Sequence, residues 1–301
     1  MKKRIAQSLL FIGLLATFIF IWALVEPYFI NIEKEEAIIP HLPEEWEGKQ
    51  IAAVGDFQVG MWMGNEATVR KAAEELVEIK PEAVLLLGDY VYHSVQSEYV
   101  ERQKVADLIQ PLTEADIPVF AVLGNHDYVV ESDGAEPNEL KAQQITYILE
   151  EHGITVLQNE AVPLTLTETG VLTETASPNA LYIVGLGASW PGMSDSATAL
   201  DGVPNSAARI VMMHNPSAFA ELPEASAPIA VAGHTHGGQV KIPLIPKEWR
   251  LKEEEHADYG WVDDYGAAGN ALYINPGIGF SNRPIRFNMP PEITVFTLRS
   301  E

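Results

Sequence analysis

Short apolar runs alternate with amphipathic segments in the first half of the chain. Continuous apolar runs lie at 51–56, 83–89 and 118–125, and helical spacing of apolar residues follows at 66–79 and at about 98–110. Continuous rather than alternating apolar runs predict strands that are buried on both faces, in a largely parallel sheet with helices between the strands. Polar residues stand where each run ends, which in such sheets is the edge where ligands bind.

The second half has a different texture after a helix predicted near 138–152. A short helix is predicted near 217–222, and 167–180 and 191–208 are typical of loops. Strands are predicted at 154–166, 181–186, 209–213, 229–232, 271–274 and 292–298. This pattern indicates a second, more mixed sheet stacked on the first. We expect one domain, because polar motifs from both halves have to meet for the chemistry described below.

The N-terminus carries a long apolar segment. Three basic residues at positions 2–4 precede Ile5–Val25, about 21 uncharged residues that would span roughly 31 Å as a helix. We therefore expect a single-pass anchor at 1–25 in the cytoplasmic membrane, with the N-terminus inside. A linker without a core would follow at 26–48, and an extracytoplasmic domain at 49–301. A cleaved signal peptide is the main alternative, and a core helix of a soluble protein is another.

Composition removes several classes of function. The chain has 42 Asp and Glu against 19 Lys and Arg, for a net charge of −23, and it has no Cys. Disulfide frameworks, thiolate metal sites and Cys nucleophiles are excluded. The composition argues against nucleic acid as a partner, because sequence-independent binding needs a basic surface to displace counterions. At 47% hydrophobic residues the chain has enough apolar content for a folded core.

Five polar motifs directly follow predicted strands and supply a mixed set of oxygen and nitrogen ligands. They are Gly55-Asp56-Phe57-Gln58, Gly88-Asp89 with Tyr92 and His93, Gly124-Asn125-His126-Asp127, His214-Asn215, and Gly233-His234-Thr235-His236. Such a set suits divalent Mn, Fe or Zn. In the last motif, both His side chains of an extended segment would point to the same side. The motifs therefore predict a metal centre at the carboxyl edges of the strands.

In their order and spacing these motifs resemble the signature of the calcineurin-like metallophosphoesterase family, over roughly residues 50–300. The resemblance implies an α/β fold, a four-layer αββα sandwich of two mixed sheets. It also implies an enzyme that hydrolyses a phosphodiester, phosphomonoester or pyrophosphate with a hydroxide bridging two divalent metal ions. The tail around 275–293 resembles a membrane-associated bacterial branch that includes proteins similar to UDP-2,3-diacylglucosamine pyrophosphatases.

Roles follow from the resemblance position by position. Asp89 would bridge the two metals. The remaining ligands would be Asp56 and His236 for the first metal, and Asn125, His214 and His234 for the second. The catalytic pair would be His126, which as an imidazolium protonates the leaving oxygen, and Asp127, which orients His126. General acid catalysis of this kind contributes about 10²–10⁴-fold to the rate.

Gln58 departs from the family pattern, which has His at this position. One interpretation is a ligand exchange that shifts the preference from Zn toward Mn or Fe, because an amide oxygen is a harder ligand than imidazole. A second makes Tyr92 a ligand of the first metal, as in purple acid phosphatases of the same superfamily. The third is loss of the first metal, which would leave a catalytically silent metal-binding envelope module.

Substrate contacts are less specific. Arg283 and Arg286 are candidates for binding the substrate phosphate, although pairing with carboxylates within the protein is an equal alternative. His93 either reaches the substrate or lies in an exposed loop. Trp62 and Met63 are expected to pack in a loop or core, with an apolar wall for a lipid or nucleoside as the alternative. The anchor favours a lipid-linked or envelope-derived substrate.

Overall fold

Two β-sheets stacked face to face form the body of the computed structural model, which describes residues 2–92, 98–167, 172–242 and 259–301. The first sheet has the order β1-β13-β2-β3-β4-β5. Its strands are β1 (Asn31–Ile39), β13 (Glu292–Ser300), β2 (Gln50–Val54), β3 (Ala83–Leu86), β4 (Val119–Ala121) and β5 (Thr155–Val156). From β2 to β5 all pairings are parallel, as the continuous apolar runs predict.

The second sheet has the order β11-β12-β10-β9-β8-β6-β7 and mixes parallel with antiparallel pairs. Its strands are β6 (Glu160–Leu166), β7 (Leu172–Thr173), β8 (Leu181–Gly185), β9 (Arg209–Met212), β10 (Ala230–Ala232), β11 (Gly260–Val262) and β12 (Leu272–Ile274). Strand β7 lies within 167–180, where we expected only a loop, and β11 falls in a stretch without a strand prediction.

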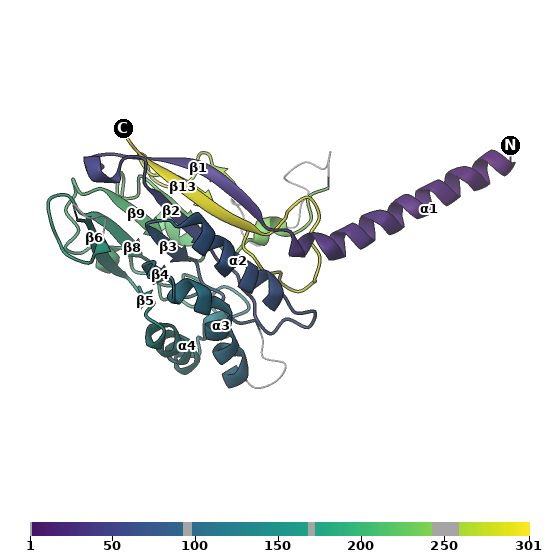
Figure 1. The fold of residues 1–301 in the computed structure, drawn as a ribbon, viewed down its shortest axis with the longest axis horizontal. Coiled ribbons are helices and arrows are strands. Elements are labelled where there is room, and N and C mark those ends of the chain that lie inside the picture. The colour runs from purple at the N-terminus through teal and green to yellow at the C-terminus, as the bar shows by residue number, and fades with distance from the viewer. Residues whose placement is uncertain (1, 93–97, 168–171, 243–258) are drawn as a thin grey trace.

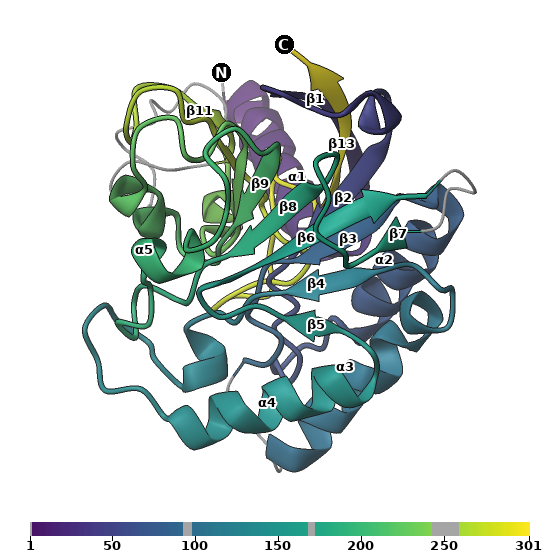
Figure 2. The same ribbon diagram turned by 90° about the vertical axis from the view of Figure 1, so that its left-hand side faces the viewer.

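Helices cover the outer face of the first sheet (Figure 2). They are α2 (Glu66–Ile79), α3 (Glu98–Thr113) and α4 (Glu139–Glu151). Their apolar faces join Val54, Val84 and Ala121 in one core. A second core, which includes Leu85, Phe120 and Ile183, fills the space between the sheets.

The fourth layer is thin. The short helices α5 (Ser196–Ala199) and η4 (Pro216–Glu221) pack a third core on the outer face of the second sheet, around Phe219 and Val211. The architecture is the αββα sandwich expected from the resemblance, with most of its helical cover on one side.

The structure corrects the prediction of a linker at 26–48. Strand β1 pairs in parallel with β13 along its whole length, and Ala37, Ile39 and Trp46 are fully buried in the core between the sheets. Four of the nine residues of β1 are charged, as suits an edge strand with one solvated face, and only Ala37 and Ile39 near its end are buried. The segment therefore belongs to the domain rather than tethering it.

The N-terminal segment is a single helix, α1 (Lys2–Val25), which projects away from the sandwich (Figure 1). It is long and apolar enough to cross a membrane, as an anchor or as a signal sequence. A 3₁₀ turn, η1 (Glu26–Tyr28), follows directly and is packed against the body. The helix leaves the sandwich at the end where the loops after β2, β3 and β10 lie (Figure 1).

Candidate metal centre

The polar motifs meet at the carboxyl edges of both sheets. Asp56 and Gln58 follow β2, Asp89 follows β3, and Asn125 follows β4 in the first sheet. In the second sheet, His214 follows β9, and His234 and His236 follow β10. All seven side chains are buried, between 0% and 3% exposed. The predicted ligands, drawn from five separated segments, therefore form one cluster.

A group of three ligands is arranged to hold a cation. Atoms of Asp89, His214 and His234 all lie within 4.8 Å of one another, and His214 Nε2 is 3.3 Å from Asp89 Oδ2. His214 Nδ1 lies 2.7 Å from the Leu87 carbonyl oxygen. Since a carbonyl only accepts, Nδ1 carries the proton in this contact, and Nε2 faces the cluster. This is how second-sphere contacts orient metal-binding histidines.

Asn125 is oriented in the same sense. Its amide nitrogen donates to the Val130 carbonyl at 2.7 Å, which turns Oδ1 toward His214 Nε2 at 3.1 Å. Asn215 supports this arrangement, because its own amide nitrogen lies 3.4 Å from the same Asn125 oxygen. The oxygen of Asn125 therefore joins the three-ligand group.

A second set lies on the other side of Asp89. His236 Nε2 is 3.6 Å from Asp56 Oδ1, and Gln58 Nε2 lies 3.5 Å from His236 Nε2 while donating to Asp89 Oδ2 at 2.8 Å. Among the residues that the structure describes, Gln58 Oε1 and His236 Nδ1 are buried without a hydrogen-bond partner. An unpartnered buried amide oxygen is costly unless something else binds it. This donor set fits a hard or borderline divalent cation.

The pKa shifts of the buried groups show that the two carboxylates, Asp56 and Asp89, require positive charge nearby. Burial raises the pKa of Asp56 to about 7, to which the Asp89 carboxylate contributes. For Asp89, burial is outweighed by His214 and His126, which hold its pKa well below the usual range. In turn Asp89, against burial, raises the pKa of His214 to about 10. A proton on His214 thus supplies the charge that a bound cation would otherwise bring.

The other two histidines stay neutral. Burial, together with His214, holds the pKa of His234 well below its usual value, and burial with Arg286 lowers that of His236 to about 3. Neutral imidazole is the form that ligates metals.

The backbone at this edge is strained. Among the ligand candidates, a left-handed backbone occurs at five: Asp56, Gln58, Asp89, His234 and His236, with φ between 49° and 73°. For residues other than glycine this conformation costs about 1–2 kcal/mol each. Strain of this kind collects at sites where side chains must point to one place.

Gly277 is required by this packing. Its φ is +71°, and a Cβ there would lie 2.6 Å from the Cβ of Asp56. The tail segment therefore closes against the first motif and fixes the Asp56 side chain.

Asp127 has a different role from the expected one. Its carboxylate accepts backbone hydrogen bonds from Gly124 (2.8 Å), Asp89 (2.9 Å) and Tyr90 (3.0 Å). It thus ties the loop after β4 to the loop after β3. We expected Asp127 to orient His126, but both carboxylate oxygens bond to backbone groups. Asp127 is a positioning residue for Asp89.

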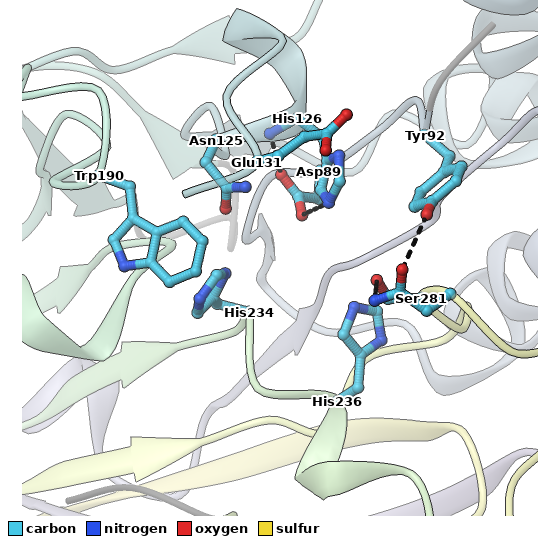
Figure 3. A pocket seen from close by; sticks show the side chains of 10 residues that line it. Asp89, Tyr92, Asn125, His126, Glu131, Trp190, His234, His236 and Ser281 are labelled. Carbon is cyan, nitrogen blue, oxygen red and sulfur yellow. Dashed lines mark hydrogen bonds and ion pairs between the residues drawn. The ribbon is translucent and has the colours of Figure 1, made fainter. Parts of the chain in front are cut away.

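A cavity of about 230 Å³ opens over the cluster (Figure 3). His126 lines it, with Nε2 4.0 Å from Asp89 Oδ2, in contact distance of a group bound there. The Tyr92 ring lies 5.1 Å from the His126 ring, and its hydroxyl donates to Asn282 at 3.4 Å. Tyr92 therefore forms part of the cavity wall, and its role as a metal ligand stays a prediction.

Four further residues of the cavity wall were given no role from the sequence. They are Glu131, Trp190, Ser281 and Asn282. Trp190 meets the edge of His234 with ring centroids 4.3 Å apart. Its backbone N–H, like that of Ser189, donates to Asn215 Oδ1. The sequence offered only one indication that Trp190 lines the cavity, namely its position after a predicted strand. Many loop residues share that position.

Arg286 does not bind substrate. It is fully buried, and its guanidinium donates to the carbonyls of Pro276 (2.7 Å), Gly279 (3.0 Å) and Met289 (3.2 Å). It holds the tail segment in place. Arg283 is exposed, and its phosphate-binding role stays a prediction. His93 lies outside the described residues.

Comparison with known proteins agrees with this site. Residues 49–238 match the calcineurin-like phosphoesterase family. Phosphodiesterase YaeI of Escherichia coli is 32% identical over 74% of this chain and 72% of its own length. The uncharacterized metallophosphoesterase YkuE of Bacillus subtilis is 25% identical, covering 92% of this chain and 88% of YkuE. UDP-2,3-diacylglucosamine pyrophosphatase LpxG of Chlamydia trachomatis is 24% identical over 91% of each chain.

Proposed function

Because the chain belongs to the calcineurin-like phosphoesterase family, we propose that it is a membrane-anchored hydrolase that uses two divalent metal ions to cleave phosphoester bonds. Membership makes it a metallophosphoesterase. The observation that carries the proposal is the buried group of Asp89, His214 and His234, with ligand atoms within 4.8 Å. Asn125 would complete that site. Asp56, His236 and the orphaned oxygen of Gln58 would hold the other cation.

Bound divalent cations would supply Lewis acidity to activate water and to offset phosphoryl charge. The chain's own groups do the rest. His126, on the cavity wall with Nε2 4.0 Å from Asp89 Oδ2, is placed to donate a proton to the leaving oxygen. Trp190 and Tyr92 bound the cavity and would restrict how a substrate lies over the ligands.

The substrate class proposed is a phosphodiester or pyrophosphate in or near the cell envelope. Two relatives support this, since one is named as a phosphodiesterase and another as a pyrophosphatase of UDP-2,3-diacylglucosamine. The apolar helix α1 supports a single-pass anchor in the cytoplasmic membrane with the domain outside. Resemblance of the tail to the membrane-associated branch agrees with this placement.

One observation favours a different function. Gln58 Nε2 lies between Asp89 Oδ2 (2.8 Å) and His236 Nε2 (3.5 Å), so the amide fills space between two ligands of the first cation. If the amide keeps this orientation when the protein is loaded, only one cation binds. The chain would then be a metal-binding envelope module without turnover.

Hydrolysis of bis-p-nitrophenyl phosphate separates the two functions. Full-length protein in detergent, stripped with a chelator, is assayed with Mn, Fe, Zn or Co. The matched variants are His214→Ala and His152→Ala, because each histidine has Nδ1 near a backbone carbonyl, at 2.7 Å and 2.8 Å. We expect metal-dependent turnover that His214→Ala abolishes and His152→Ala retains. No turnover by folded, metal-loaded protein would favour the silent module.

A further inference from the structure

Helix α1 joins the domain directly, because the turn that follows it, η1, is already packed against the body. The helix ends at Val25, and the carboxylate of the next residue, Glu26, is already buried. It accepts hydrogen bonds from the backbone N–H groups of Met289 (2.6 Å) and Asn288 (3.1 Å). One turn earlier in α1, the Ala23 carbonyl accepts from the backbone of Arg286 at 3.0 Å. Three hydrogen bonds therefore attach the end of the helix to the tail loop.

This attachment fixes the height of the domain above a membrane. The uncharged part of α1 measures roughly 31 Å, about the thickness of the hydrocarbon core. If α1 spans the bilayer, the core ends near Val25. Segments packed around Glu26 then lie at the level of the lipid headgroups, since no linker lifts them away.

Exposed apolar side chains gather in these segments. We call them the apolar rim: Tyr28 (39% exposed), Phe29 (52%), Trp62 (67%), Met63 (39%) and Ile242 (48%). This overturns the expectation that Trp62 and Met63 are packed. Phe29 stacks on Trp22 of α1, with ring centroids 5.8 Å apart. Aromatic rings at this level are typical of side chains that lie in the membrane interface.

Hydrogen bonds place the parts of the rim around the end of α1. The loop with Trp62 leads into α2, whose Thr68 hydroxyl donates to the Pro27 carbonyl at 3.2 Å. Ile242 follows Lys241, whose backbone N–H donates to Phe287 and whose carbonyl accepts from Asn288. Asn288 in turn is bound to Glu26. Segments that are distant in sequence thus lie close to the end of the helix (Figure 1).

The same loops shape the cavity over the metal ligands. Ser281 and Asn282 line it, and Ser281 is bonded on both sides to Gln239, three residues before Ile242. At the other end of this loop the Met289 side chain packs against Gly237, next to His236. The cavity and the apolar rim are therefore parts of one surface at the same end of the molecule.

We propose that the apolar rim rests in the headgroup region of the bilayer and that the cavity takes its phosphoester from a lipid of that leaflet. The proposal rests on the hydrolase function and on α1 as a span. Apolar contact is the attraction required, because the chain has a net charge of −23 and its cations Lys2, Lys3 and Arg4 lie at the far end of α1, so the domain is repelled by anionic lipids. Arg283, exposed next to Asn282, is a cation at the edge of this surface for a lipid phosphate.

Depth measurements test the rim without using activity. Since the chain has no Cys, a single Cys can be labelled cleanly in the full-length protein, reconstituted in phosphatidylcholine nanodiscs. Trp62→Cys is compared with Ile38→Cys, an equally apolar position that is 55% exposed. Ile38 lies seven residues along β1 from Asn31, which is about 23 Å of extended chain. We expect doxyl-lipid quenching of a fluorophore at 62 and little at 38. Equal quenching at the two positions overturns the proposal.

Turnover of two substrates with the same leaving group tests the lipid source. One is soluble bis-p-nitrophenyl phosphate, and the other is a p-nitrophenyl phosphodiester of diacylglycerol within the nanodisc. For Trp62→Ser with Met63→Ser, we expect an unchanged rate on the soluble ester and a loss of about tenfold on the lipid ester, from poorer alignment. Equal retention on both overturns the lipid assignment. If the parent protein cleaves neither, the hydrolase function fails, while the depth measurement still decides the rim.

Discussion

Asp127→Ala is expected to destabilise the whole domain rather than only slow the reaction. The Asp127 carboxylate is 2% exposed and accepts three backbone N–H groups, from Gly124, Asp89 and Tyr90. Its removal leaves three buried donors unsatisfied, each at a cost of about 1–3 kcal/mol. With partial relaxation the loss is roughly 3–6 kcal/mol, a large part of a total stability of about 5–15 kcal/mol.

The assay is urea unfolding of the full-length protein in detergent with excess chelator, so that bound metal does not contribute. Asp127→Asn is expected to fall between the parent and Asp127→Ala, because it keeps one acceptor oxygen. Asp195→Ala is the matched control. Asp195 also accepts from the backbone, at Thr198 (3.0 Å), but it caps the short helix α5 at the surface. That change should cost about 0.5–2 kcal/mol.

The alternative role of Asp127 gives the opposite result. If it acted by orienting His126, Asp127→Ala would lower turnover and shift its pH profile while the free energy of unfolding stayed within about 1 kcal/mol of the parent, the ordinary effect of one mutation. Such a pattern would refute the positioning role derived from the hydrogen bonds.

Three further changes test other parts of the site. Gly277→Ala should strongly lower both the bound metal and the turnover, because the new Cβ would lie 2.6 Å from the Cβ of Asp56. The control Gly153→Ala also has a positive φ (+79°) but has open space around it, so it should cost only about 1–2 kcal/mol in the free energy of unfolding. Equal effects of the two variants would contradict the packing argument. His126→Ala should reduce turnover by about 10²–10⁴-fold with metal content unchanged by elemental analysis, and metal loss would instead make His126 a ligand. Gln58→His should shift the metal preference toward Zn in competition binding, and an identical metal profile would argue that residue 58 binds no metal.

The buried strands of the first sheet and the polar residues that follow them could be predicted from the sequence. Buried strands such as β2 and β3 are apolar apart from Gln50 at the start of β2, and helix α2 carries a clear 3.6-residue period, so these elements could be predicted directly. Ligand candidates such as Asp89 and His214 follow strands in a fixed order, and the parallel topology brings them to one edge.

Other features depend on contacts that no local pattern encodes. Strand β1 contains three Glu and one Lys in sequence, so its composition resembles a linker until β13, more than 250 residues away, pairs with it. Arg286 resembles a phosphate ligand in sequence, but the carbonyls that surround it come from a turn of its own loop. Trp190 and the apolar rim belong to loops, whose exposure is set by what packs beside them.

Manganese titration of the full-length protein, with bound metal and turnover of bis-p-nitrophenyl phosphate measured on the same samples, tests the central claim most directly. Asp89→Asn is compared with Asp201→Asn, an exposed position. The account predicts that turnover rises with metal occupancy, up to two ions per chain, in the parent and in Asp201→Asn. Asp89→Asn is expected to lose both metal binding and turnover. Full turnover by folded Asp89→Asn, or by metal-free parent protein, would contradict it.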